Sequence, residues 1–142
     1  MVKAAAVVTG DGSELQSLID GLFFGEIPDF TVSAVVATER GSRALARSES
    51  AGIPGYEVDA AIFPNAATFT RALTAKLLDL DADIAILVGV EPEPEEGLYR
   101  AFAGRCVCLR IARGADTVSA AAVLADADGS EARRFGRVSV PA

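Results

Sequence analysis

The chain has 142 residues, of which 51% are hydrophobic, and a formal net charge of −7. This length fits one domain with a substantial core, and the acidic balance excludes proteins that bind nucleic-acid backbones or anionic membranes through clustered Lys and Arg. The sequence contains no histidine. Ser-His-Asp and Cys-His catalysis are therefore excluded, and because the commonest transition-metal ligand is missing we expect no metal site.

The apolar segments indicate a protein that neither enters nor crosses a membrane. The run at the amino terminus is too short for a signal peptide, and the longest uninterrupted run, Ile84–Val90, is far shorter than a bilayer span. We therefore expect a cytoplasmic protein. Its high apolar content predicts a homo-oligomer or a contact with a protein partner.

The chain opens with a predicted strand, Ala4–Val8, followed by a glycine turn and an amphipathic helix. Glycines allow a tight turn, and the free N–H groups of the first helical turn can hold an anion, usually a phosphate. The same residues also fit an ordinary capped turn, in which Ser13 and Gln16 form a capping box. The residues of the predicted phosphate cradle are Gly10, Asp11, Gly12, Ser13 and Glu14.

Strand and helix patterns alternate through the next part of the chain, which is typical of βαβ units and a parallel sheet. The predicted elements are a strand at Val32–Ala37, an alanine-rich helix that ends near Gly52, a short strand at Tyr56–Val58, a helix at Ala66–Leu80 and a buried strand at Ile84–Val88. The acidic segment Glu91–Glu96 is expected as a solvated loop that enters a helix bearing Leu98 and Phe102.

The last third of the chain predicts three further strands. The first, Cys106–Ile111, places Cys106 and Cys108 on the same face, so a disulfide between them is not expected. The other two form an antiparallel hairpin around an Asp-Gly turn. The predicted fold is a single α/β domain over residues 1–142, a three-layer sandwich with a mainly parallel, Rossmann-like sheet and a carboxyl-terminal antiparallel hairpin.

Five short motifs occur in a fixed order. A Gly-x-Gly-Ser-x-Leu-Gln loop at Gly10–Gln16 is followed by an Ala-Gly-Ile-Pro turn at Ala51–Pro54 and an apolar strand between Asp and Gly at Asp83–Gly89. An aromatic-Ala-Gly-Arg step at Phe102–Arg105 and an Asp-Gly turn at Ala127–Ser130 come later. Their order over most of the chain resembles the phosphoribosylglycinamide formyltransferase family, which implies the formyltransferase fold.

The resemblance also implies a site. In that family the phosphate of the ribonucleotide sits on the first loop, and an Asn, a His and an Asp assist formyl transfer from 10-formyltetrahydrofolate to an amine. Here Cys108 stands at the Asn position and Arg110 at the His position, and Asp128 is the candidate equivalent of the Asp. The family's long loop after the His is represented only by the short Arg113–Asp116 connection. These departures predict a degenerate, truncated member.

Three functions follow from this interpretation. The leading hypothesis is a non-catalytic interaction, regulatory or structural subunit, without a cofactor but with a residual pocket for a small phosphorylated ligand or nucleotide. The second is an enzyme of altered transfer chemistry in the same cleft, in which Cys108 or Asp128 reacts and Arg110 binds an anion. The third is a residual formyltransferase that still uses 10-formyltetrahydrofolate.

Each candidate residue also has a simpler structural role. Cys108 fits a small buried apolar position, and Asp128 before a glycine fits a hairpin turn whatever its ancestry. Arg110 fits an ion pair with Asp116 or Asp128 at a strand end. The sequence leaves these alternatives open.

Overall fold

The computed structural model describes residues 2–9, 30–88, 90 and 93–141. The strands are β1 (Val2–Val8), β2 (Phe30–Ala37), β3 (Gly55–Glu57), β4 (Ile84–Val88), β5 (Cys106–Arg113), β6 (Thr117–Ala125) and β7 (Glu131–Pro141). The helices are α2 (Arg43–Ser50), the 3₁₀ helix η1 (Ala60–Ile62), α3 (Ala66–Asp79) and α4 (Glu96–Ala101). Among the described residues, no helix is long and apolar enough to cross a bilayer.

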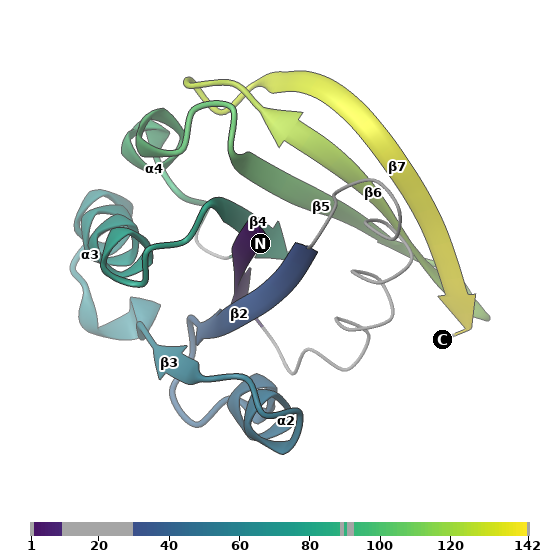
Figure 1. Cartoon of the computed structure of the whole chain (residues 1–142), viewed down its shortest axis with the longest axis horizontal. Coiled ribbons are helices and arrows are strands. Elements are labelled where there is room, and N and C mark those ends of the chain that lie inside the picture. Colours follow the sequence, from purple (N-terminus) through teal and green to yellow (C-terminus); the bar gives the residue numbers. More distant parts are fainter. Residues whose placement is uncertain (1, 10–29, 89, 91–92, 142) are drawn as a thin grey trace.

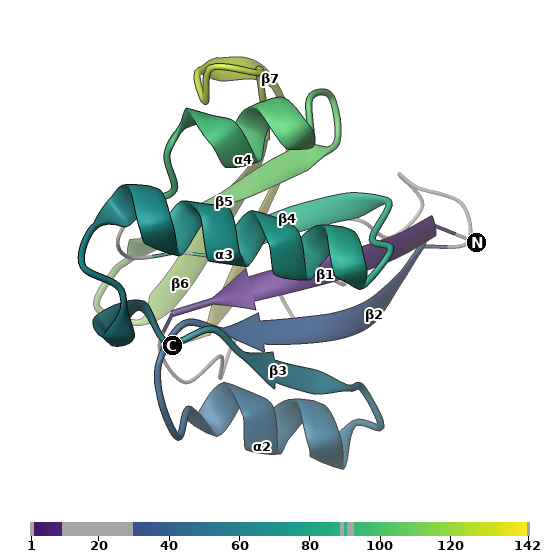
Figure 2. The same ribbon diagram turned by 90° about the vertical axis from the view of Figure 1, so that its left-hand side faces the viewer.

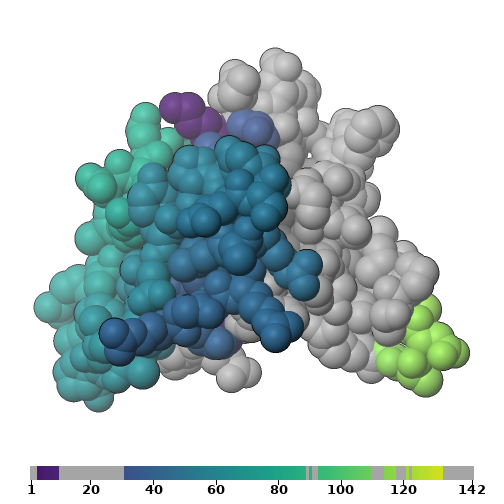
Figure 3. All heavy atoms as spheres, turned by 90° about the horizontal axis from the view of Figure 1, so that it is seen from below, coloured from purple at the N-terminus to yellow at the C-terminus, as the bar shows by residue number. Residues whose placement is uncertain are grey.

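The seven strands form one sheet in the order β3-β2-β1-β4-β5-β6-β7 (Figure 1). The four pairings from β3 to β5 are parallel, and α2, α3 and α4 lie in the connections from β2 to β3, from β3 to β4 and from β4 to β5. The pairings of β6 with β5 and β7 are antiparallel. A short connection, which projects at one corner of the molecule (Figure 3), joins β5 to β6 and permits only this direction. The predicted fold class is confirmed.

Helices cover both faces of the sheet, which gives the expected three layers. Side chains alternate along β1, so that Ala5 and Val7 join the core formed with α3 and α4, whereas Ala6 and Val8 join the core formed with Ala44 of α2. Figure 2 shows α3 and α4 lying over one face. The helix predicted directly after β1 lies outside the described residues.

The helix α3 illustrates how the sequence fixes the core. Asn65 caps its first turn, with Oδ1 accepting the backbone N–H of Thr68 at 2.9 Å. Phe69, Leu73 and Leu77 recur at four-residue spacing, and all three are fully buried. The predicted helix boundaries are confirmed to within one residue at the carboxyl end.

Two adjacent leucines in α3 test this core. Leu77 is fully buried, whereas Leu78 is 54% exposed. Leu77→Ala should lower the free energy of unfolding by about 2–5 kcal/mol, because it removes buried methyl groups and leaves a cavity. Leu78→Ala is the matched control and should cost under about 1 kcal/mol. Urea unfolding followed by circular dichroism measures both, and equal losses would contradict this account of the core.

Candidate functional site

The carboxyl edge of the parallel strands is the first candidate site. The chain leaves β1 toward β2 on one side and later returns to β4 on the other, so a topological switch point lies between β1 and β4. Ligands of open α/β sheets bind outside the carboxyl ends of the strands at such a point. The predicted phosphate cradle, Gly10–Glu14, follows β1 at this edge but lies outside the described residues. Its role stays a prediction.

A partly buried pair of hydroxyl groups links Thr9, the last described residue before the predicted loop, to Thr38. The Oγ1 atoms of Thr9 and Thr38 lie 2.6 Å apart, and Thr38 is 2% exposed. The backbone N–H of Thr38 also donates to the carbonyl oxygen of Val8 at 3.1 Å. These bonds join the ends of β1 and β2, so the point from which the glycine loop leaves the sheet is firmly held.

Arg110 belongs to the same edge by backbone register. Ala37, Val8, Val88 and Leu109 form one row across β2, β1, β4 and β5. Arg110 is the next residue of β5, where it pairs with Ala121 of β6. Its side chain lies outside the described part of the structure, so anion binding by Arg110 stays a prediction.

Cys108 is buried on the face of the sheet that α3 and α4 cover. It is 5% exposed and belongs to the same core cluster as Leu98 and Phe102 of α4. Cys106 is fully buried on this face too, as predicted, and the two cysteines do not form a disulfide. A hydrogen bond with the Cys108 thiol, burial and the charge of that neighbour raise the pKa of Cys106 far above its usual range. Cys106 therefore stays protonated.

Asp128 lies in the turn between β6 and β7. Its Oδ1 accepts hydrogen bonds from the backbone N–H of Ser130 at 2.9 Å and from the Ser130 hydroxyl at 2.6 Å. The hydroxyl, followed by the backbone N–H, lowers the pKa of Asp128. Gly129 has a φ of +88°, and a Cβ there would lie 3.0 Å from the Tyr99 ring. Asp128 thus has the contacts of a hairpin-turn residue against α4.

The strand ladder separates the predicted site residues. The hairpin turn follows the Val107–Leu124 pair, at the amino end of β5, whereas Arg110 lies beyond the carboxyl end of β4. From Ala121, the partner of Arg110, to the end of β6 at Ala125 the strand alone covers about 13 Å. The backbone thus places Arg110 beside the carboxyl edge and Asp128 at the opposite edge, with the buried Cys108 between them.

The motifs of the family resemblance that lie within the described residues form turns and strand contacts. Gly52 and Gly104 have φ values of +76° and +74°, and each ends the turn after a helix. Arg105 donates to the carbonyl oxygens of Asp83 and Ala101, both at 3.2 Å. Asp83 in turn accepts the backbone N–H of Lys3 at 2.9 Å. These residues hold β1, α4 and β4 together.

Comparison with known proteins agrees with this fold. No family model matches the chain. The chain is 28% identical to a phosphoribosylglycinamide formyltransferase of Haemophilus influenzae over 105 residues, which cover 74% of this chain and 49% of that protein. The chain thus spans about half the length of the curated relative that it matches.

Solved structures of the same kind superpose on nearly the whole chain. Glycinamide ribonucleotide transformylase 1 from Symbiobacterium toebii has a TM-score of 0.77 at 22% identity, with 99% of this chain and 74% of that chain covered. Phosphoribosylglycinamide formyltransferase from Brucella melitensis has a TM-score of 0.75 at 19% identity, with 99% and 80% covered. This chain has the formyltransferase fold. The resemblance inferred from the five motifs is confirmed.

Sequence reasoning missed one feature of the described residues, a surface hollow beside α3. It lies against Ile62, which is 74% exposed, and against Val58 and Phe63. The available signal was the apolar run Ala60–Phe63, which follows neither helix nor strand periodicity. Within the part of the chain that the structure describes, no group of three His, Cys, Asp or Glu side chains could hold a metal ion.

The turn contacts of Asp128 make a pH-dependent prediction. Ser130→Ala removes the hydroxyl donor, so the pKa of Asp128 should rise toward its ordinary value, which a carboxyl-carbon NMR titration measures. Because the native pKa is depressed, its contribution to stability is complete above the unfolded pKa of about 3.9. That contribution is lost as the pH falls through the native pKa. An unchanged titration in the variant would contradict the hydrogen bond between the Ser130 hydroxyl and Asp128.

The burial of the two thiols predicts their reactivity. Because Cys106 is fully buried and Cys108 is 5% exposed, both should react with Ellman's reagent in the native protein about a hundredfold or more slowly than in the urea-unfolded chain. Cys106→Ala and Cys108→Ala identify which thiol reacts. Rapid labelling of native Cys108 would instead favour a reactive cysteine.

Proposed function

We propose that this chain is a non-catalytic protein of the formyltransferase fold that acts by binding, as an interaction, regulatory or structural subunit. The observation that carries this proposal is the environment of position 108, where the family resemblance expects an Asn. The Cys108 side chain is buried in the core under α3 and α4. A buried thiol is a weak hydrogen-bond donor, so it cannot replace an amide that polarises a formyl carbonyl.

The other two positions support the same proposal. Arg110 replaces the expected His, and a guanidinium stays protonated in proteins, so it cannot take a proton from the attacking amine. The Asp128 carboxylate accepts two hydrogen bonds from Ser130 in the turn near the amino end of β5, whereas Arg110 lies by register at the carboxyl edge of the parallel strands. Transfer chemistry requires its groups to meet around one reacting atom. Because Arg110 and Asp128 lie at opposite edges by register, they do not meet around one atom.

Two features of the described residues support a protein that does not use 10-formyltetrahydrofolate. The family resemblance implies that the segment after β4 helps to hold the folate, and here that segment, Val90–Pro94, is acidic and includes the exposed residue Glu93. A folate carries carboxylates of its own, so this segment repels it. The connection between β5 and β6 is only the exposed segment Gly114–Asp116, which is too short to form the wall that the family builds there.

A smaller anion pocket is the part of the family site that we retain in the proposal. In the sequence the Gly10–Glu14 loop follows Thr9, whose hydroxyl group lies against that of Thr38. By register, Arg110 is one residue beyond Leu109 in the same row in which Thr9 and Thr38 are one residue beyond Val8 and Ala37. A phosphate on the loop's N–H groups would gain from a guanidinium in that row, whereas Glu14 would oppose it. We propose a small phosphorylated compound as its ligand and a protein partner or a second copy as the binding partner.

A formyl-transfer assay tests the proposal. With 10-formyltetrahydrofolate and glycinamide ribonucleotide, the protein should form no product above the uncatalysed rate, because its Asn and His positions cannot support transfer. The Haemophilus influenzae enzyme serves as the positive control. Turnover that is lost in Asp128→Asn would overturn the proposal and establish a surviving formyltransferase.

Ligand binding is measured separately in the same samples. Glycinamide ribonucleotide or inorganic phosphate should raise the melting temperature, and Arg110→Gln should reduce that rise, because a ligand that binds only the folded state stabilises it by mass action. A rise without turnover supports a binding protein with the residual pocket. Unchanged melting temperatures would remove the anion pocket from the proposal.

A further inference from the structure

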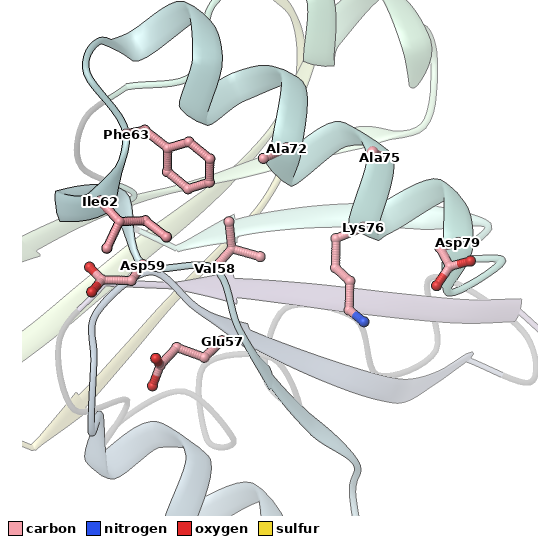
Figure 4. A pocket seen from close by; sticks show the side chains of 9 residues that line it. All are labelled: Glu57, Val58, Asp59, Ile62, Phe63, Ala72, Ala75, Lys76 and Asp79. Atoms are coloured by element: carbon pink, nitrogen blue, oxygen red, sulfur yellow. The ribbon is translucent and has the colours of Figure 1, made fainter.

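A hollow of about 550 Å³ lies between α3 and the segment that runs from β3 through η1. Figure 4 shows Phe63 and Val58 on one side of it and Ala72 of α3 on the other. These side chains form an apolar floor. Ile62 borders the hollow and is 74% exposed. Removing an isoleucine side chain from water is favourable, so a partner that covered Ile62 would be stabilised by this contact.

Carboxylates surround this floor. Glu57, Asp59 and Asp79 line the hollow, and Lys76 is the one cation among its lining residues. The Nζ atom of Lys76 lies 4.2 Å from the centroid of the Tyr56 ring, so its charge is engaged on an aromatic face. With three carboxylates and one ammonium group, the lining of this hollow carries a net negative charge.

The carboxylates keep acceptor capacity for a ligand. Glu57 Oε2 accepts the backbone N–H of Gly41 at 3.1 Å, and Asp59 Oδ1 accepts that of Ala61 at 3.0 Å. Each bond fixes its side chain and leaves the other carboxylate oxygen available. Asp79, the last residue of α3, is exposed, and its carboxylate has no hydrogen bond or ion pair with the rest of the described chain.

The surface continues across α3. A second hollow of about 430 Å³ lies on the other flank of the helix and shares Ala75 with the first. Its lining includes Leu78, which is 54% exposed, the acidic residue Glu95 and one cation, Arg71, so the excess of carboxylates lies in the first hollow. Ile62 and Leu78 are the two large hydrophobic side chains that the described residues expose, and one lies in each hollow. Figure 2 shows α3 between β3 and α4, facing outward.

We propose that these two hollows form one docking surface, the α3 surface, for a basic segment of another protein. An aliphatic or aromatic side chain of that segment fills the hollow beside Ile62, and its Lys or Arg side chains meet Glu57, Asp59 and Asp79. This inference specifies the partner in the binding role proposed above and rests on that role.

Shape and charge select this occupant. The 14 residues of α3 extend over about 21 Å, which matches six or seven residues of an extended chain better than one compact metabolite. A second copy of this chain is disfavoured, because its net charge of −7 would repel the acidic rim. Nucleic acids and anionic membranes are repelled in the same way.

Selection from a phage-displayed library of random peptides on the full chain tests the proposal. The enriched peptides should carry a net positive charge and at least one large apolar residue. The best of them, made synthetically, should bind about tenfold or more weakly to Ile62→Asp and to Asp79→Lys. Glu49→Lys makes the same charge change as Asp79→Lys at an exposed position of α2 and should bind the peptide like the parent chain.

Three readouts decide the outcome. Because Ile62, Asp79 and Glu49 are all exposed, circular dichroism should show the three variants folded. Amide chemical shifts of the parent chain should move around β3, η1 and α3, and affinity should fall as salt rises. Failure to enrich peptides, enrichment of acidic ones, or binding unaffected by Ile62→Asp and Asp79→Lys would overturn the α3 surface. Formyl transfer is measured independently, so turnover would refute the non-catalytic role without changing the peptide result.

Discussion

Burial of β1 on both faces is the constraint on which the other elements depend. Ala4, Ala5 and Ala6 are fully buried, with β2 and β4 hydrogen-bonded on either side and helices packed above and below. Their small side chains allow the helices to approach the sheet closely, and any polar residue there would lose its hydration without a partner. The position of β1 then fixes the row in which β2 and β4 end and beyond which β5 continues to Arg113.

The elements themselves could be predicted because their patterns are local. The continuous apolar run of β4 and the four-residue spacing in α3 indicate their type and burial directly. The arrangement of the candidate site could not be predicted, because it depends on register between strands that are far apart in the sequence. Only the ladder reveals that Arg110 and Asp128 lie at opposite edges, and only the β1–β2 register pairs Thr9 with Thr38.

The family resemblance predicted the fold because its motifs perform structural work. Gly52 and Gly104 supply backbone conformations that other residues rarely adopt, and Asp83 links the starts of β1 and β4. Such positions tolerate few substitutions, so they carry similarity even at low identity. Cys108 and Arg110 occupy regular strand positions where many side chains are compatible with the fold. Similarity at the turns is thus evidence for the fold. Evidence for a catalytic activity has to come from the side chains at the site, here Cys108 and Arg110.

The contact between Gly129 and Tyr99 links two parts of the molecule that the chain order separates. With only 3.0 Å between a Cβ at 129 and the ring, neither position can gain volume unless the other loses it. Tyr99 is itself 5% exposed and shares a core cluster with Cys108. Among related chains the two positions should therefore vary together. Where the glycine of the hairpin turn is replaced by a larger residue, the tyrosine of α4 should be replaced by a smaller one.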